Sequence, residues 1–192
     1  MAGFTMTRNW ISYPDRYLGQ TSMQNNAIIF FEYFTALGWT AECIAGMLGN
    51  IQVESTINPG LWQGRSIPPD IYTTNKGYGL TQWTPARKMI QWADQLGLDY
   101  QDGNTQLQRI LYERENNLQW STDNILKYTW DDFVNSTESP EILARVFVWA
   151  YERPEDPDIA LRQQNARSWY NFLQSYLRLP IWLLFKIRGG IQ

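Results

Sequence analysis

The residue best suited to carry out chemistry in this sequence is Glu54, at the end of an apolar helical pattern. Four apolar residues before it recur at the spacing of one buried helix face: Ile44, Met47, Leu48 and Ile51. Pro59-Gly60 then ends the helix. Partial burial and the negative end of the helix dipole should both raise the pKa of Glu54. A carboxylic acid that keeps its proton near neutral pH is what acid-catalysed glycoside cleavage requires, whereas the structural alternative is a solvated glutamate at a helix end.

Composition removes several other kinds of site. The 192 residues include no His and a single Cys, Cys43, and the net charge is −3. Without His we expect no catalytic triad with a His base and no ordinary zinc hydrolase site, and we expect no cofactor or metal. Cys43 lies inside the apolar helix and is expected to be a buried small hydrophobe. Because no run of Lys or Arg occurs, nucleic acid is not expected as a partner.

A second carboxyl group is harder to find. Glycoside hydrolysis normally uses two, and their separation decides whether configuration is inverted or retained. Asp70 is the only acidic residue in the Gly-, Pro- and Thr-rich loop of residues 60–77, and we take it as the candidate. Without it, Gln82 and Thr81 could hold a water. Alternatively, the acetamido and hydroxyl groups of the sugar could complete the reaction and leave an anhydro end.

The elements that must position these residues are mostly helices. The periodicity predicts helices over residues 21–37, 40–56, 85–96, 104–118, 139–150 and 158–177. The stretch from Ile142 to Ala150 is apolar almost all round, so we expect it to be the central helix. The short alternating segment Gly77–Trp83 suits a small β-hairpin.

One domain is expected, with an extension at each end. Residues 1–20 read as an N-terminal arm, 21–177 as the domain, and 178–192 as an apolar C-terminal tail or linker. The apolar run 180–185 is too short to span a bilayer. It would dock on the domain, or contact a partner protein or a membrane surface. No secretory signal is visible in residues 1–20, so delivery outside a cell would need another route.

Three blocks of the sequence together resemble the phage tail lysozyme family of the lysozyme-like superfamily. They are Gly46–Gln63, Gly77–Ala86 and Tyr151–Pro154, within a resemblance that covers about residues 21–175. Glu54-Ser55 with Asn58-Pro59-Gly60, followed by Gly79-Leu80-x-Gln82, is similar to motifs of goose-type lysozymes and soluble lytic transglycosylases. The closest resemblance is to the lysozyme domains of podovirus tail-knob, cell-wall-degrading proteins.

The resemblance implies a mainly α (α+β, lysozyme-like) fold, with a helical bundle around a central helix and a small β-hairpin beside the substrate cleft. Glu54 would be the proton donor. The resemblance also implies substrate-binding residues: Gln82, Tyr151, Tyr78, Trp83 and Ser55. The structural alternatives are a hairpin hydrogen bond for Gln82 and core packing for Tyr151. Glu152 and Arg153 are expected to pair with each other and fix a turn.

The implied function is that of a virion-associated peptidoglycan hydrolase. It would cut the glycan strand between amino sugars so that a phage tail can penetrate the bacterial wall. Its partners would be peptidoglycan and other tail proteins. It would be located at the tail tip or knob of the virion. A lytic transglycosylase and a non-catalytic, glycan-binding tail protein remain alternatives. The absence of disulfides fits synthesis in a reducing cytoplasm. The chain is expected to be either a lysozyme-only protein or one piece of a longer protein.

Overall fold

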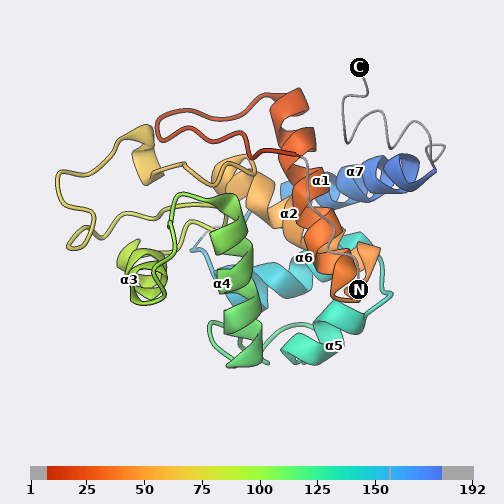
Figure 1. Ribbon diagram of the computed structural model, residues 1–192. Helices are drawn as coiled ribbons and strands as arrows, with labels where there is room; N and C mark the ends of the chain where they lie inside the picture. Colours follow the sequence, from red (N-terminus) through yellow and green to blue (C-terminus); the bar gives the residue numbers. More distant parts are fainter. Residues whose placement is uncertain (1–7, 156, 179–192) are drawn as a thin grey trace, which may run out of the picture.

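The computed structural model describes residues 8–155 and 157–178, and these form a mainly helical structure (Figure 1). The seven α-helices of this part are α1 (Gln20–Ala36), α2 (Ala41–Ser55), α3 (Arg87–Gln95), α4 (Gly103–Glu115), α5 (Trp130–Asn135), α6 (Pro140–Phe147) and α7 (Ile159–Leu177). A short 3-10 helix η1 (Gln63–Arg65) and a π-helix η2 (Val148–Glu152) complete the elements. The helix positions predicted from the apolar periodicity are confirmed.

The central helix is α2, which packs against α1, α5, α6 and α7. The segment Ile142–Ala150, which the sequence predicted to be the central helix, forms α6 and the start of η2, and α6 packs against α2 and α7. Two glycines of α2 explain its position. A Cβ at Gly49 would lie 2.5 Å from the backbone oxygen of Arg162, and one at Gly46 would lie 3.0 Å from the backbone of α6. The absence of these side chains lets α6 and α7 approach α2 closely.

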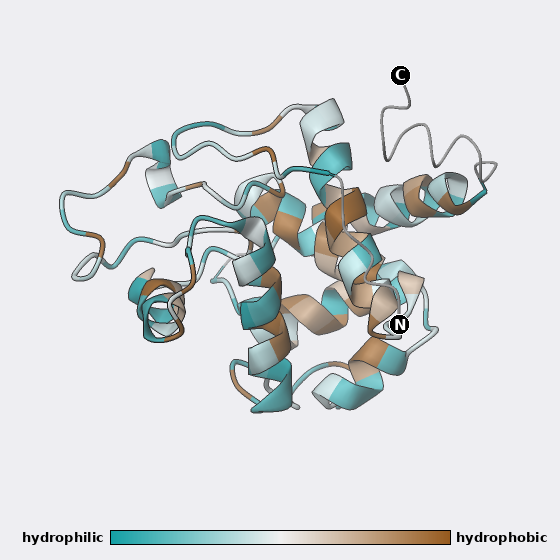
Figure 2. Cartoon of the chain, viewed as in Figure 1, coloured by the Kyte–Doolittle hydropathy of each residue, from teal (hydrophilic) through white to brown (hydrophobic). Residues whose placement is uncertain are grey.

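The core is apolar and rich in aromatic rings. The helices carry both apolar and polar residues, as expected for helices with one face inward (Figure 2). Phe147 stacks on Tyr151 with ring centroids 4.7 Å apart, and Trp120 lies 4.1 Å from Trp130. Cys43 is buried without a disulfide, as predicted, and burial raises the pKa of its thiol to about 12. No helix among the described residues has the length and apolarity to cross a membrane.

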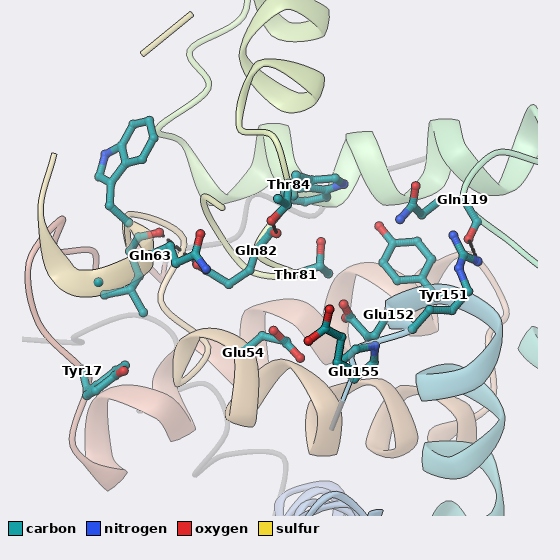
Figure 3. A pocket seen from close by; sticks show the side chains of 16 residues that line it. Tyr17, Glu54, Gln63, Thr81, Gln82, Thr84, Gln119, Tyr151, Glu152 and Glu155 are labelled. Atoms are coloured by element: carbon teal, nitrogen blue, oxygen red, sulfur yellow. Dashed lines mark hydrogen bonds between the residues drawn. The ribbon is translucent and has the colours of Figure 1, made fainter. Parts of the chain in front are cut away.

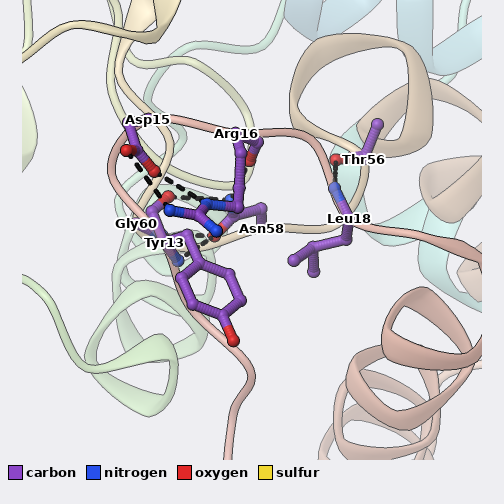
Figure 4. A network of polar contacts seen from close by, with 7 residues as sticks. All are labelled: Tyr13, Asp15, Arg16, Leu18, Thr56, Asn58 and Gly60. Atoms are coloured by element: carbon purple, nitrogen blue, oxygen red, sulfur yellow. Dashed lines mark hydrogen bonds and ion pairs between the residues drawn. The ribbon is translucent and has the colours of Figure 1, made fainter.

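The segment before α1 is fixed to the loop after α2 by polar contacts (Figure 4). Asn58 is fully buried, and its amide makes two hydrogen bonds to the backbone of Tyr13, one to Arg16 O and one to Gly60 N. The hydroxyl of Thr56 accepts a bond from Leu18 N at 2.8 Å. The expected division into arm, domain and tail stays a prediction, and residues 179–192 of the expected tail lie outside the described residues.

The expected β-hairpin is only partly formed. Within the described chain it is reduced to two isolated bridges, Trp62 with Tyr78 and Tyr78 with Trp83. Gly79 and Gln82 have positive φ angles of 81° and 48°, so the chain turns too tightly between the bridges for a ladder to extend. The segment is therefore a turn that packs beside the end of α2.

Candidate active site

A cleft of about 610 Å³ opens beside the C-terminal end of α2. Its walls come from the segment before α1, α2, the loop and turn of residues 61–84, and η2 with the residues after it. Figure 3 shows Glu54, Glu152 and Glu155 gathered on one side, with Thr81 and Gln82 facing them and Tyr17 at the far end. The structure therefore brings four of the site residues expected from the sequence to one cleft, Glu54, Gln82, Trp83 and Tyr151, and their roles stay predictions.

Glu54 is held by an arginine from a distant part of the sequence. Oε1 of Glu54 accepts a hydrogen bond from Nη2 of Arg162 at 2.6 Å, and the two side chains are 20% and 4% exposed. Arg162 is fixed in turn, because it donates to Oδ1 of Asn50 at 3.1 Å and to the backbone oxygen of Pro157 at 2.7 Å. This charge-assisted contact sets the direction of the Glu54 carboxyl group within the cleft.

Glu152 is the second carboxyl group beside Glu54. Burial and then the charge of Glu54 raise the pKa of Glu152 well above its ordinary value, although Arg162 and Arg153 lower it. Oε1 of Glu152 is enclosed and accepts no hydrogen bond from any described residue. The expected pair of Glu152 with Arg153 is wrong: Nη1 of Arg153 donates to the backbone oxygens of Gln119 and Ala150 at 2.9 and 2.6 Å.

A buried glutamate of α4 ties two walls of the cleft together. Glu113 accepts hydrogen bonds from Nε1 of Trp83 at 3.0 Å, from Nε of Arg109 at 2.8 Å and from the hydroxyl of Tyr151. Burial raises the pKa of Glu113 despite these donors, and burial followed by the charge of Glu113 raises the pKa of Tyr151. Both the core packing expected for Tyr151 and its place on the cleft are therefore observed.

The remaining residues of the turn divide between cleft and core. Nε2 of Gln82 donates to the backbone oxygens of Leu61 and Gly79, both at 3.0 Å, so this side chain shapes the turn as well as lining the cleft. Tyr78 does not line the cleft but is buried with its ring 4.6 Å from that of Trp62, and burial raises its pKa. Ser55 is also buried, and its hydroxyl donates to the backbone oxygen of Leu80 at 2.8 Å.

Asp70 is not among the residues that line the cleft. Its two carboxylate oxygens accept hydrogen bonds from Tyr72 N and from the hydroxyl of Thr73, both at 2.8 Å. The backbone bond from Tyr72 lowers the pKa of Asp70 most, followed by the bond from Thr73. The structure thus uses this carboxylate to fix an exposed turn, and a catalytic role for Asp70 stays a prediction.

Three residues of the site were missed by the assignment from sequence. Tyr17 lines one end of the cleft, and the guanidinium of Arg65 lies 5.3 Å from its ring centroid. Glu152 was assigned to a turn, although a glutamate at the end of an apolar helix is the same signal that identified Glu54. Arg162 is 108 positions from Glu54 in sequence, and no local pattern could have paired them.

A mainly helical protein with a glutamate at the end of a buried helix, beside a polar cleft, is consistent with the lysozyme-like class. A family model described as phage tail lysozyme matches residues 25–173, and the chain belongs to this family. The chain is also similar to "Morphogenesis protein 1" of Bacillus phage B103, with 44% identity over 157 residues. That match covers 82% of this chain and 41% of the relative, so the chain spans well under half of that protein's length.

Proposed function

We propose that this protein is a virion-associated peptidoglycan hydrolase that cuts the glycan strand of a bacterial wall. The observation that carries the proposal is the position of Glu54, whose carboxyl group faces Gln82 and Thr81 across a cleft that belongs to a phage tail lysozyme. The cleft opens to solvent and has polar groups such as Glu54, Thr81 and Gln82 on its walls, which suits a hydrated polymer.

In the proposed mechanism Glu54 protonates the glycosidic oxygen as the bond to C1 breaks. Arg162 fixes the orientation of Glu54, and the bonds from Gln82 to Leu61 and Gly79 fix the opposite wall. Tyr17 is 58% exposed and offers a ring at one end of the cleft, which matches the apolar C–H faces of sugar rings, whereas Trp83 is 3% exposed and helps to form the wall. Cleavage at the wall would let a phage tail pass, with peptidoglycan and other tail proteins as partners and the tail tip or knob as location.

The test is a digest of purified peptidoglycan with the wild type and with Glu54→Gln, followed by mass spectrometry of the products. Gln keeps an oxygen that can accept the bond from Arg162, so the fold should survive while the proton donor is lost. We expect reducing-end muropeptides from the wild type and a loss of about 10²-fold or more in the variant. Glu138→Gln, an exposed glutamate at the start of α6, is the matched control and should cleave as the wild type does.

The products separate the alternatives. Anhydro ends that disappear in Glu54→Gln would identify a lytic transglycosylase with the same acid. Binding of glycan by the wild type without any products would identify a structural glycan-binding protein and refute the enzyme. Full cleavage by Glu54→Gln would refute the assignment of Glu54.

A further inference from the structure

Glu152 occupies the cleft without a polar contact that accounts for it. Its Oε1 is enclosed and unpaired among the described residues, whereas Glu54 receives Arg162 and Glu113 receives three donors. Glu152 is also the last residue of the π-helix η2, and such helices frequently occur at functional sites. Glu152 is half-buried, but an enclosed carboxyl oxygen without a hydrogen-bond partner costs folding free energy, so its presence in the cleft calls for a role.

We propose that Glu152 shares one proton with Glu54 and supplies Glu54 with the proton that is donated to the glycosidic oxygen. This inference rests on the proposed function, and it gives Glu152 a role exerted through Glu54. The geometry supports it: both side chains line the same cleft, they lie on the same side of it in Figure 3 together with Glu155, and the charge of Glu54 acts on Glu152. Arg162 forms an ion pair with Oε1 of Glu54, whereas no described residue donates to Oε1 of Glu152, so the oxygen that is free to carry the shared proton is on Glu152.

The charges around Glu152 agree with this assignment. From α2 it faces Glu54, from α4 Glu113, from α7 Arg162, and after η2 Arg153. Burial and the two glutamates raise the pKa of Glu152, the two arginines lower it, and the raising effects dominate. Two carboxyl groups that interact in this way release their protons as a pair rather than independently.

The proton balance closes over one cycle. The proton moves from Glu152 to Glu54, and Glu54 passes it to the glycosidic oxygen, which takes the electron pair of the breaking bond to C1. In the hydrolytic reaction, the water that then forms the new bond to C1 releases one proton. The carboxylate pair takes up that proton and returns to its starting state.

The test compares the pH dependence of kcat/KM on purified peptidoglycan for the wild type, Glu152→Gln and Glu138→Gln. The basic limb of the profile should move to lower pH in Glu152→Gln, and activity on the basic side should fall about tenfold for every pH unit that the limb moves. The maximum at acid pH should be affected less, because Gln has the shape of the protonated side chain. Glu138→Gln is the matched control: it removes an exposed carboxylate outside the cleft, and its limb should stay in place because solvent and salt screen it.

A second measurement does not depend on activity. The infrared difference spectrum between the wild type and Glu152→Gln should contain the band of a protonated carboxyl group at neutral pH, which excludes any contribution from Glu113. The same band should titrate at lower pH in Glu54→Gln, where the neighbouring charge is gone. An unchanged basic limb in Glu152→Gln, or no such band in the difference spectrum, would overturn the inference. A wild type that gives no cleavage products would instead refute the proposed function, and the infrared result would still decide whether Glu152 holds the proton.

Discussion

Replacing Asn58 by Ala should release the segment before α1 and destabilise the protein. The amide of Asn58 has two donors and two acceptor positions, and all four are used, at 2.8 to 3.1 Å. Each bond contributes about 1 kcal/mol net, and exposed Tyr13 and Arg16 can recover part of the loss by bonding water. We therefore expect a loss of about 2–4 kcal/mol, which lowers Tm by roughly 5–15 °C in a protein of this size.

The assay is urea unfolding together with trypsin cleavage after Arg16, which should become faster in Asn58→Ala because that backbone loses its anchor. Asn58→Asp keeps the two acceptor bonds but turns a carboxylate toward two carbonyl oxygens, so it should be similarly destabilised and recover partly at acid pH. Asn135→Ala is the control, since its amide makes one exposed bond within α5. A cost for Asn58→Ala below about 1 kcal/mol, or equal to that of Asn135→Ala, would refute the reasoning.

Three further substitutions test other parts of the site. In thermal melts, Glu152→Gln should raise the free energy of unfolding by about 1–3 kcal/mol near pH 7 and leave it unchanged near pH 4. The pKa of Glu152 is raised in the folded state, so the stability of the wild type falls as the pH rises above the ordinary Glu value. Equal effects at both pH values would contradict this. Asp70→Asn should change kcat by less than about twofold, since Asp70 fixes an exposed turn; a 10²-fold loss would restore it as the second catalytic carboxylate. Tyr17→Ala should raise KM on peptidoglycan about fivefold, the equivalent of about 1 kcal/mol of ring contact, with kcat unchanged; an unchanged KM would exclude Tyr17 from binding.

The sequence predicted the helices and the place of Glu54 because both follow from local patterns. The apolar stripe before Glu54 has the period of a helix with one buried face, and α2 forms over that stripe. Ser139-Pro140 likewise predicted the start of α6, where the Ser139 side chain accepts a hydrogen bond from the backbone of Ile142. These features depend on residues a few positions apart, which is the range over which a single sequence is informative.

The partners of these residues could not be predicted in the same way. Arg162 reaches Glu54 because Gly49 lets α7 approach α2, and this contact joins residues far apart in the chain. The prediction of a β-hairpin was only partly right for a different reason. Alternation of side chains predicts a strand, but the turn at Gly79 and Gln82 limits the backbone pairing to two isolated bridges. Ser55 was predicted to bind substrate because it belongs to a motif, whereas its hydroxyl donates a hydrogen bond that ties the turn to α2.

The charges of the cleft explain why its carboxyl groups differ although both are glutamates. Glu54 is 20% exposed and receives a guanidinium, while Glu152 ends a π-helix with one oxygen enclosed and unpaired among the described residues. Environments that separate the titration of two neighbouring acids allow one to hold a proton while the other accepts hydrogen bonds. A core optimised for stability alone would carry an apolar residue or an amide in place of Glu152. The unpaired Oε1 of Glu152 therefore lowers the stability of the fold but serves the proposed chemistry. Glu152→Gln should accordingly gain stability and lose activity at neutral pH.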